Sequence, residues 1–186
     1  RIADGGFVGY VIILLGLIAL ALAAERLMTL SRIGGRVKTQ SKNLSSADSG
    51  NPLGRVLQVY SKNKGVDAET LQLKLDEAVL KEQPLINARI AFIKIISMVA
   101  PLLGLLGTVI GMIVTFQAIT LFGTGDPKTM AGGISQALIT TVLGLTVAIP
   151  TVLLHSIVDS RAKGILHILT EQSAGMVAQH AESPSS

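Results

Sequence analysis

Three long stretches without charged side chains constrain this sequence most. The clearest covers residues 95–122, and residues 7–24 and 132–158 form two more. A bilayer core is about 30 Å thick and is crossed by roughly 20 apolar residues in a helix. Each stretch is therefore long enough, or nearly so, to span a membrane. The sequence predicts an all-α polytopic membrane protein with three transmembrane helices.

The second stretch carries small or weakly polar residues at alternating steps of four and three. This spacing places them along one face of a helix. Small residues let membrane helices approach closely, so the stripe favours helix packing. A hydroxyl on the stripe can also bind an ion or water, so a pore wall or a socket for another helix is the alternative. The members are Ser97, Pro101, Gly104, Thr108, Gly111, Thr115 and Ala118.

The third stretch carries a matching face, and Thr140 borders it. The two stripes can pack on each other within one subunit. Repeated around a symmetry axis, they can instead line a central channel. The members of this second face are Gly133, Ala137, Thr141, Gly144, Ala148, Thr151 and His155.

Neither stripe contains a carboxylate. No ionisable residue occurs between Lys94 and Asp126, and none between Lys128 and His155. Proton carriers inside membranes are usually Asp, Glu or His. His155 is near the end of its span, where an interfacial role is the simpler interpretation. A pathway for H⁺ or Na⁺ built by this chain therefore needs a carboxylate from another protein.

Lysine and arginine gather between the first two spans and after the third. The positive-inside rule then places the N-terminus in the periplasm and both basic regions in the cytoplasm. We expect residues 1–25 to form a periplasmic lead and the first span, 26–92 a cytoplasmic helical region, 93–158 the other two spans with a short periplasmic loop at 123–131, and 159–186 a cytoplasmic tail. This distribution explains the net charge of +4 without nucleic acid.

Four basic residues follow the first span directly, where anionic lipid head groups would attract them. These candidate lipid contacts are Arg26, Arg32, Arg36 and Lys38.

Two amphipathic helices are predicted in the basic region. Asn51 is expected to cap the first, with Pro52 at its first position and Gly65 after its end. Asp67 is expected to cap the second, and Pro84 to interrupt or bend it. In the tail, apolar residues continue a helix to about Gln179, and residues 181–186 are expected to be disordered.

Several kinds of site are excluded or unsupported. The chain has no cysteine, so it forms neither a disulfide nor a thiolate metal site. No metal-spaced histidine group, catalytic triad or phosphate-binding loop is present, so we expect neither an enzyme nor a cofactor.

Two motifs together resemble the MotA/TolQ/ExbB family, and most closely its ExbB branch. They are APLLGLLGTVIG at 100–111, and GGISQALITTVLGL at 132–145 followed by AIP at 148–150. The resemblance implies an inner-membrane ion channel in which five copies surround the single-span helices of an ExbD-like partner that bears an essential Asp. In the ExbB branch, a TonB-like protein passes the energy to outer-membrane receptors for siderophore uptake.

The resemblance also implies roles for single residues. Thr108 and Thr141 match the hydroxyls that face the partner's Asp, and Thr140 and Thr115 add hydroxyls nearby. Gln136 replaces the usual Glu and is about 140° away from the Thr141 face, so it is expected to touch a neighbouring helix or subunit.

Several alternatives remain open from the sequence. A TolQ-type subunit would serve envelope constriction, and a MotA-type subunit flagellar rotation, although MotA relatives usually have four spans. A non-conducting membrane scaffold is the alternative from another class. The start at Arg1 also fits a longer, TtpC-like relative of three-component Ton systems.

Overall fold

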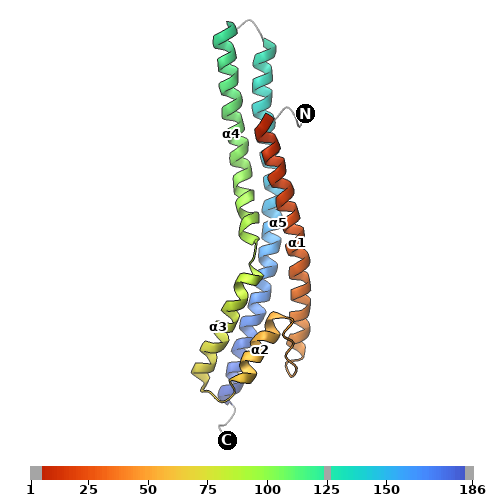
Figure 1. Cartoon of the computed structure of the whole chain (residues 1–186), viewed down its shortest axis with the longest axis vertical. Helices are drawn as coiled ribbons and strands as arrows, with labels where there is room; N and C mark the ends of the chain where they lie inside the picture. The colour runs from red at the N-terminus through yellow and green to blue at the C-terminus, as the bar shows by residue number, and fades with distance from the viewer. Residues whose placement is uncertain (1–5, 124–126, 183–186) are drawn as a thin grey trace. The chain divides into compact units, whose positions relative to one another are not determined.

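The structure is a computed structural model that describes residues 6–123 and 127–182. The described part is helical and contains no strand. Three of its helices are long and apolar enough to cross a membrane, which confirms the predicted all-α fold with three spans. In chain order the helices are α1 (Gly6–Lys42), α2 (Pro52–Lys62), α3 (Ala68–Ile86), α4 (Ile90–Phe122) and α5 (Pro127–Glu182) (Figure 1).

The described residues separate into two compact units. Unit 1 contains the residues up to Ala24 and those from Arg89 to Ser156, and unit 2 contains the rest. The long helices α1 and α5 contribute residues to both units, whereas α4 belongs to unit 1 and α2 and α3 belong to unit 2. The apolar spans are therefore gathered in unit 1.

Unit 1 consists of α4 and the first parts of α1 and α5. Gly16 of α1 lies against Val147 of α5, where an added Cβ would be only 2.9 Å from the valine side chain. The outer faces of all three helices expose large apolar side chains, among them Leu14, Leu102 and Leu138. In a membrane, such faces are covered by lipid or by other helices.

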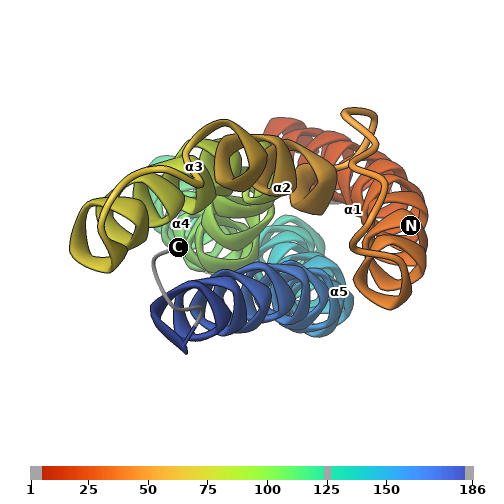
Figure 2. The ribbon, with the colours of Figure 1, turned by 90° about the horizontal axis from the view of Figure 1, so that it is seen from below.

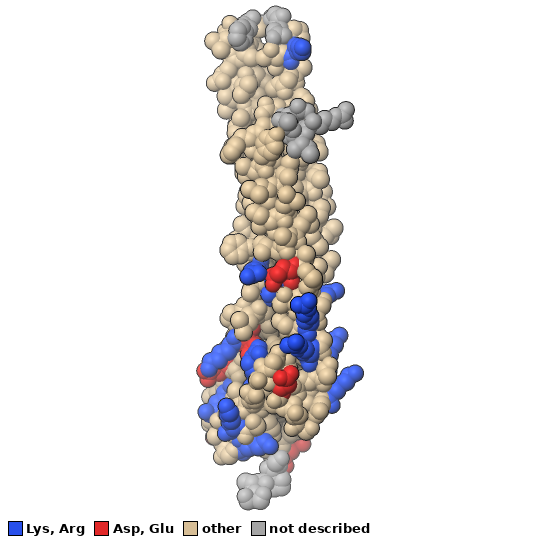
Figure 3. All heavy atoms as spheres, turned by 45° about the vertical axis from the view of Figure 1, so that its right-hand side comes forward, with Lys and Arg blue, Asp and Glu red and all other residues tan. Residues whose placement is uncertain are grey.

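Unit 2 is a helical bundle with its own core. Leu53 of α2, Leu71 and Leu75 of α3, and Leu169 of α5 are fully buried. Within this unit α2 lies between α3 and the unit 2 part of α1 (Figures 1 and 2). Lysine, arginine and carboxylate side chains gather on unit 2, while the visible face of unit 1 is almost free of charge (Figure 3).

The predicted caps of the two short helices are confirmed. The side chain of Asn51 accepts a hydrogen bond from the backbone N–H of Gly54, and Pro52 is the first residue of α2. The side chain of Asp67 accepts one from the N–H of Thr70 at the start of α3. Such caps satisfy N–H groups that have no partner inside the helix. The first helix ends earlier than expected, at Lys62 rather than near Gly65.

The expected interruption at Pro84 is wrong in position. Helix α3 includes Pro84 and continues to Ile86. The break comes at residues 87–89, where Arg89 has a φ of 63°. This is the left-handed region, which a non-glycine residue seldom adopts and which ends a right-handed helix.

Both ends of α5 also differ from the expectation. Residues 127–131, expected to be loop, form the first turns of α5, because a proline is well suited to the first position of a helix. Residues 124–126 lie outside the described part. Helix α5 reaches Glu182, so Ala181 and Glu182 are helical; residues 183–186 also lie outside the described part.

Candidate functional site: the contact between α4 and α5

The two small-residue stripes face each other within one protomer. A Cβ added to Gly144 would lie 2.8 Å from the carbonyl oxygen of Ala100, and one added to Gly104 would lie 3.0 Å from that of Thr140. A Cβ added to Gly111 would lie 2.8 Å from the Cβ of Ala137. These distances are too short for larger side chains. Backbone contact between α4 and α5 therefore depends on glycine along the whole contact.

Two of the four candidate threonines fill this contact. Thr115 is buried, and its hydroxyl donates to the carbonyl oxygen of Gly111 at 2.9 Å while lying against Gly133. Thr140 is 1% exposed, and its hydroxyl donates to the carbonyl oxygen of Ala137 at 2.8 Å. Both hydroxyls are satisfied by backbone carbonyls inside the helix pair. Within one protomer these two threonines pack the helices together.

The other two candidate threonines lie at the edge of the contact. Thr108 and Thr141 are both half-buried. The Thr108 hydroxyl donates to the carbonyl oxygen of Leu105 at 2.6 Å. The Thr141 hydroxyl lies 3.5 Å from the carbonyl oxygen of Gly104. Each hydroxyl keeps lone pairs that accept from a further group. Thr108 and Thr141 are therefore the candidate threonines whose side chains come nearest to the surface of the chain.

The remaining stripe residues pack the two helices. Ser97 is buried and donates to the carbonyl oxygen of Lys94 at 2.6 Å. Pro101 is half-buried. The other predicted packing positions are all buried, and they are Gly104, Gly111, Gly133, Ala137, Gly144 and Ala148.

The amide of Gln136 lies against α1. A Cβ added to Gly6, the first residue of that helix, would collide with the Gln136 Nε2 atom. The side chain therefore contacts a neighbouring helix of its own protomer, on a different side of α5 from Thr141.

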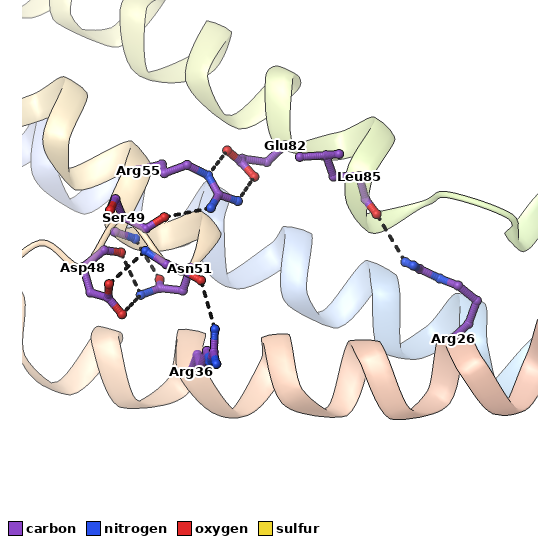
Figure 4. A network of polar contacts seen from close by, with 10 residues as sticks. Arg26, Arg36, Asp48, Ser49, Asn51, Arg55, Glu82 and Leu85 are labelled. Carbon is purple, nitrogen blue, oxygen red and sulfur yellow. Dashed lines mark hydrogen bonds and ion pairs between the residues drawn. The ribbon is translucent and has the colours of Figure 1, made fainter.

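The expectation that Arg26 contacts lipid is wrong for this protomer. Arg26 is 5% exposed, and its guanidinium donates to the carbonyl oxygens of Leu85 at 3.2 Å and Ile86 at 2.7 Å (Figure 4). These are carbonyls at the C-terminal end of α3, where a positive charge also complements the helix dipole. The other three candidates, Arg32, Arg36 and Lys38, are exposed.

Two further polar interactions in unit 2 were not predicted from the sequence. Arg55 makes a two-pronged ion pair with the buried carboxylate of Glu82, with nitrogen–oxygen distances of 2.7 and 2.6 Å (Figure 4). The hydrogen bonds that Arg55 donates to the Glu82 carboxylate raise the pKa of Arg55. The buried amide of Gln40 donates to the carbonyl oxygens of Asn43 and Ser46 and accepts from the backbone N–H of Asp48. These contacts fix the loop between α1 and α2.

A bound metal ion needs several ligating side chains close together. Among residues 6–123 and 127–182, no group of three His, Asp or Glu side chains comes close enough to hold a metal ion. The membrane-spanning part of α4 and α5 offers hydroxyl, amide and backbone carbonyl oxygens. Such groups can hydrate or coordinate a passing ion but cannot carry a proton as a carboxylate does.

A family model for the "MotA/TolQ/ExbB proton channel family" matches residues 48–171, which include α4 and most of α5. The chain belongs to this family. Membership, together with three helices able to cross a membrane, gives a membrane location and a role in energy-transducing transport.

Two curated relatives match most of the chain, and a third matches about half of it. A "putative biopolymer transport protein ExbB-like 3" from Synechocystis is 29% identical over 91% of this chain and 88% of its own length. A "putative biopolymer transport protein ExbB homolog" from Methanothermobacter thermautotrophicus is 31% identical over 85% of this chain, and the match spans 61% of that protein. The "Tol-Pal system protein TolQ" from Pseudomonas aeruginosa is 30% identical over 48% of this chain and 38% of its own length.

Proposed function

We propose that this chain is an ExbB-type subunit of an inner-membrane proton channel. In this proposal five copies surround the single-span helices of an ExbD-like partner, and the proton motive force moves that partner. A TonB-like protein then passes the work to outer-membrane import, such as siderophore uptake. The single observation that carries the proposal is the helix pair α4–α5, which presents hydroxyls but no carboxylate within its apolar length.

The missing carboxylate is the reason for a partner. A proton crosses an apolar layer in steps between groups that bind and release it, and inside membranes Asp, Glu and His do this. Helices α4 and α5 supply Thr108 and Thr141, whose hydroxyls are satisfied by carbonyls of α4 and can still accept a further hydrogen bond. An Asp on a partner helix next to these hydroxyls would complete the pathway.

The oxygen atoms of α4 and α5 leave the coupling ion open, because hydroxyl and carbonyl oxygens suit Na⁺ as well as a water-borne proton path. A proton is proposed because the matching family is described as a proton channel family. The buried positions of Thr115 and Thr140 leave Thr108 and Thr141 as the hydroxyls nearest the surface.

The charge distribution supports an orientation. Lysine and arginine gather in unit 2, and the positive-inside rule places such regions in the cytoplasm. The N-terminus and the loop before α5 would then be periplasmic.

A TolQ-type role is the second candidate, and the similarity to TolQ from Pseudomonas aeruginosa favours it. A TolQ-type subunit would use the same ion-driven mechanism but would power envelope constriction instead of outer-membrane import. Growth on a siderophore as iron source, compared with resistance to detergent, separates the two in a strain that lacks the chain.

The proposal is tested by native mass spectrometry of this chain, alone and co-expressed with an ExbD-like partner. Five copies alone, and five plus two with the partner, support it. A monomer or dimer that captures no partner supports the non-conducting scaffold instead.

The threonines are tested by proton flux of the reconstituted complex. Thr108→Val and Thr141→Val each remove one hydroxyl. Losing its hydrogen bond costs about 1 kcal/mol or more, which should slow flux at least roughly fivefold. Thr120→Val is the matched control, because Thr120 is an exposed threonine of α4 outside the stripe. Wild-type flux in both stripe variants would contradict the role given to them.

A further inference from the structure

The outer face of α3 carries a stripe of exposed acidic and apolar residues. Glu69, Leu73, Asp76 and Leu80 follow one another at steps of four, three and four, so they share one helix face. Leu73 is 66% and Leu80 63% exposed. Leu71 and Leu75, on the opposite side of the helix, are fully buried in the core. Leu73 therefore faces away from the core of its own unit, while Asp76 and Leu80 also border a pocket that Thr170 of α5 helps to line.

The two acidic residues of the stripe have no ion-pair partner in the described part of the chain. The nearby ion pair of α3 joins Lys81 to Glu77 at 2.6 Å, and Glu77 is at the border of the stripe. Two exposed leucines that alternate with two unpaired carboxylates form an amphipathic surface of the kind that docks in a groove.

A groove with the opposite charge lies between α1 and α5, also in unit 2. It encloses about 450 Å³, and its walls include Ser31, Gly35, Lys38, Arg161, Gly164 and Ile168. A Cβ added to Gly35 or Gly164 would meet no atom within 4 Å, so both glycines face open space. Glycine in a helix costs about 1 kcal/mol relative to alanine, and no contact within the protomer requires it here.

Cations stand at both ends of this groove. Arg161 of α5 donates a hydrogen bond to the hydroxyl of Ser31 of α1, so the Arg161 side chain lies at the level of Ser31 along the groove. Lys38 is exposed one heptad further along α1 and has no ion-pair partner among the described residues. The nearest acidic residue on α5, Asp159, is paired with Lys163 at 2.7 Å. The cations of the groove are therefore available to an incoming acidic surface.

The spacing of the charges on the two surfaces agrees. Ser31, at the level of Arg161, and Lys38 are seven residues apart on α1, and Glu69 and Asp76 are seven residues apart on α3. Seven helical residues rise about 10 Å in both cases. Leu73 lies midway between the two carboxylates, and Gly164 lies between the levels of the two cations. In such a contact, Leu73 would lie against Gly164. The two carboxylates of the stripe would then lie beside the two cations of the groove.

We infer that α3 of one copy docks in the α1–α5 groove of a second copy. The stripe and the groove are different surfaces of unit 2, with α3 and α1 on opposite sides of α2 (Figure 2). A contact between two different surfaces can repeat from one copy to the next. It closes into a ring when the rotation that relates neighbouring copies adds up to a full turn. The inference rests on the proposed ring of copies and assigns it a contact outside the membrane.

Disulfide cross-linking tests this contact, because the natural chain contains no cysteine. One tagged chain carries Leu73→Cys and a second, differently tagged chain carries Gly164→Cys. The two are co-expressed with the partner and oxidised in membranes. The matched control replaces Gly164→Cys by Gly175→Cys, another open glycine on the same face of α5, about 16 Å further along.

A mixed dimer at least about tenfold more abundant with Gly164→Cys than with Gly175→Cys is expected, since neighbouring cysteines have a high effective concentration. Arg161→Glu should reduce this dimer, and either Glu69→Arg or Asp76→Arg should restore it and thereby give the direction of α3 in the groove. Equal yields with both glycine positions, while native mass spectrometry still finds a ring, would overturn the docking and leave the proposed function intact. Loss of the ring itself in the unsubstituted chain would count against both.

Discussion

Gly144 of α5 touches the backbone of α4 at Ala100, where an added Cβ would lie 2.8 Å from the carbonyl oxygen. Backbone atoms cannot move aside as the end of a flexible side chain can. This contact therefore sets how closely the two helices pack, and it lies next to Thr141, one of the two half-exposed threonines.

Gly144→Ala should destabilise the α4–α5 contact. Overpacking of this kind costs about 1–3 kcal/mol, so the midpoint of thermal unfolding in detergent should fall by several degrees. Gly132→Ala is the control, because a Cβ at Gly132 meets no atom within 4 Å and alanine favours the helix. Equal midpoints for the two variants would show that the close contact does not exist.

Arg26→Met should loosen the C-terminal end of α3. The substitution removes hydrogen bonds from a charged donor to the carbonyls of Leu85 and Ile86, which are worth about 1.5–3 kcal/mol. We expect faster hydrogen exchange of the backbone amides in the last turn of α3. Arg32→Met is the control, because Arg32 is an exposed arginine of α1, the helix that carries Arg26. This variant should leave the hydrogen exchange of α3 unchanged. If both variants exchange alike, Arg26 does not hold α3.

Acid should weaken the start of α3 through Asp67. The backbone N–H of Thr70, followed by its hydroxyl, holds the pKa of Asp67 below its ordinary value. A carboxyl with a lowered pKa contributes stability above its unfolded pKa of about 3.9 and loses it as the pH falls through the folded value.

Asp67→Asn tests this direction of the pH dependence, because asparagine also caps helices but does not titrate in this range. In the natural chain, amide signals of the first turn of α3 should report fraying as the pH falls below about 4. In the variant they should not. Identical acid titrations of the two chains would exclude Asp67 as the titrating group.

Local features of the structure were predictable from the sequence. The caps at Asn51 and Asp67 and the three apolar spans depend on neighbouring residues, so periodicity and residue type are enough to find them. The small-residue stripes were also visible, but the sequence left open whether each stripe faces its own protomer or another. Helical spacing gives the face of a helix and not the identity of the helix opposite.

Contacts between distant residues were not predictable. Arg26 and Ile86 are 60 residues apart, and Arg55 and Glu82 are 27 apart. An arginine just after a span looks the same in sequence whether it reaches a lipid head group or the end of another helix. A glutamate on the buried side of α3, in line with Leu71 and Leu75, was the one available indication that Glu82 has a partner.

Proton flux into vesicles tests the central claim most directly, namely that this chain forms the wall of a channel whose carboxylate comes from a partner. The chain alone, the chain with its ExbD-like partner, and the chain with a partner whose membrane Asp is replaced by Asn are compared under the same membrane potential. The account predicts flux only with the unchanged partner. Flux through the chain alone, or undiminished flux with the Asn partner, would contradict it.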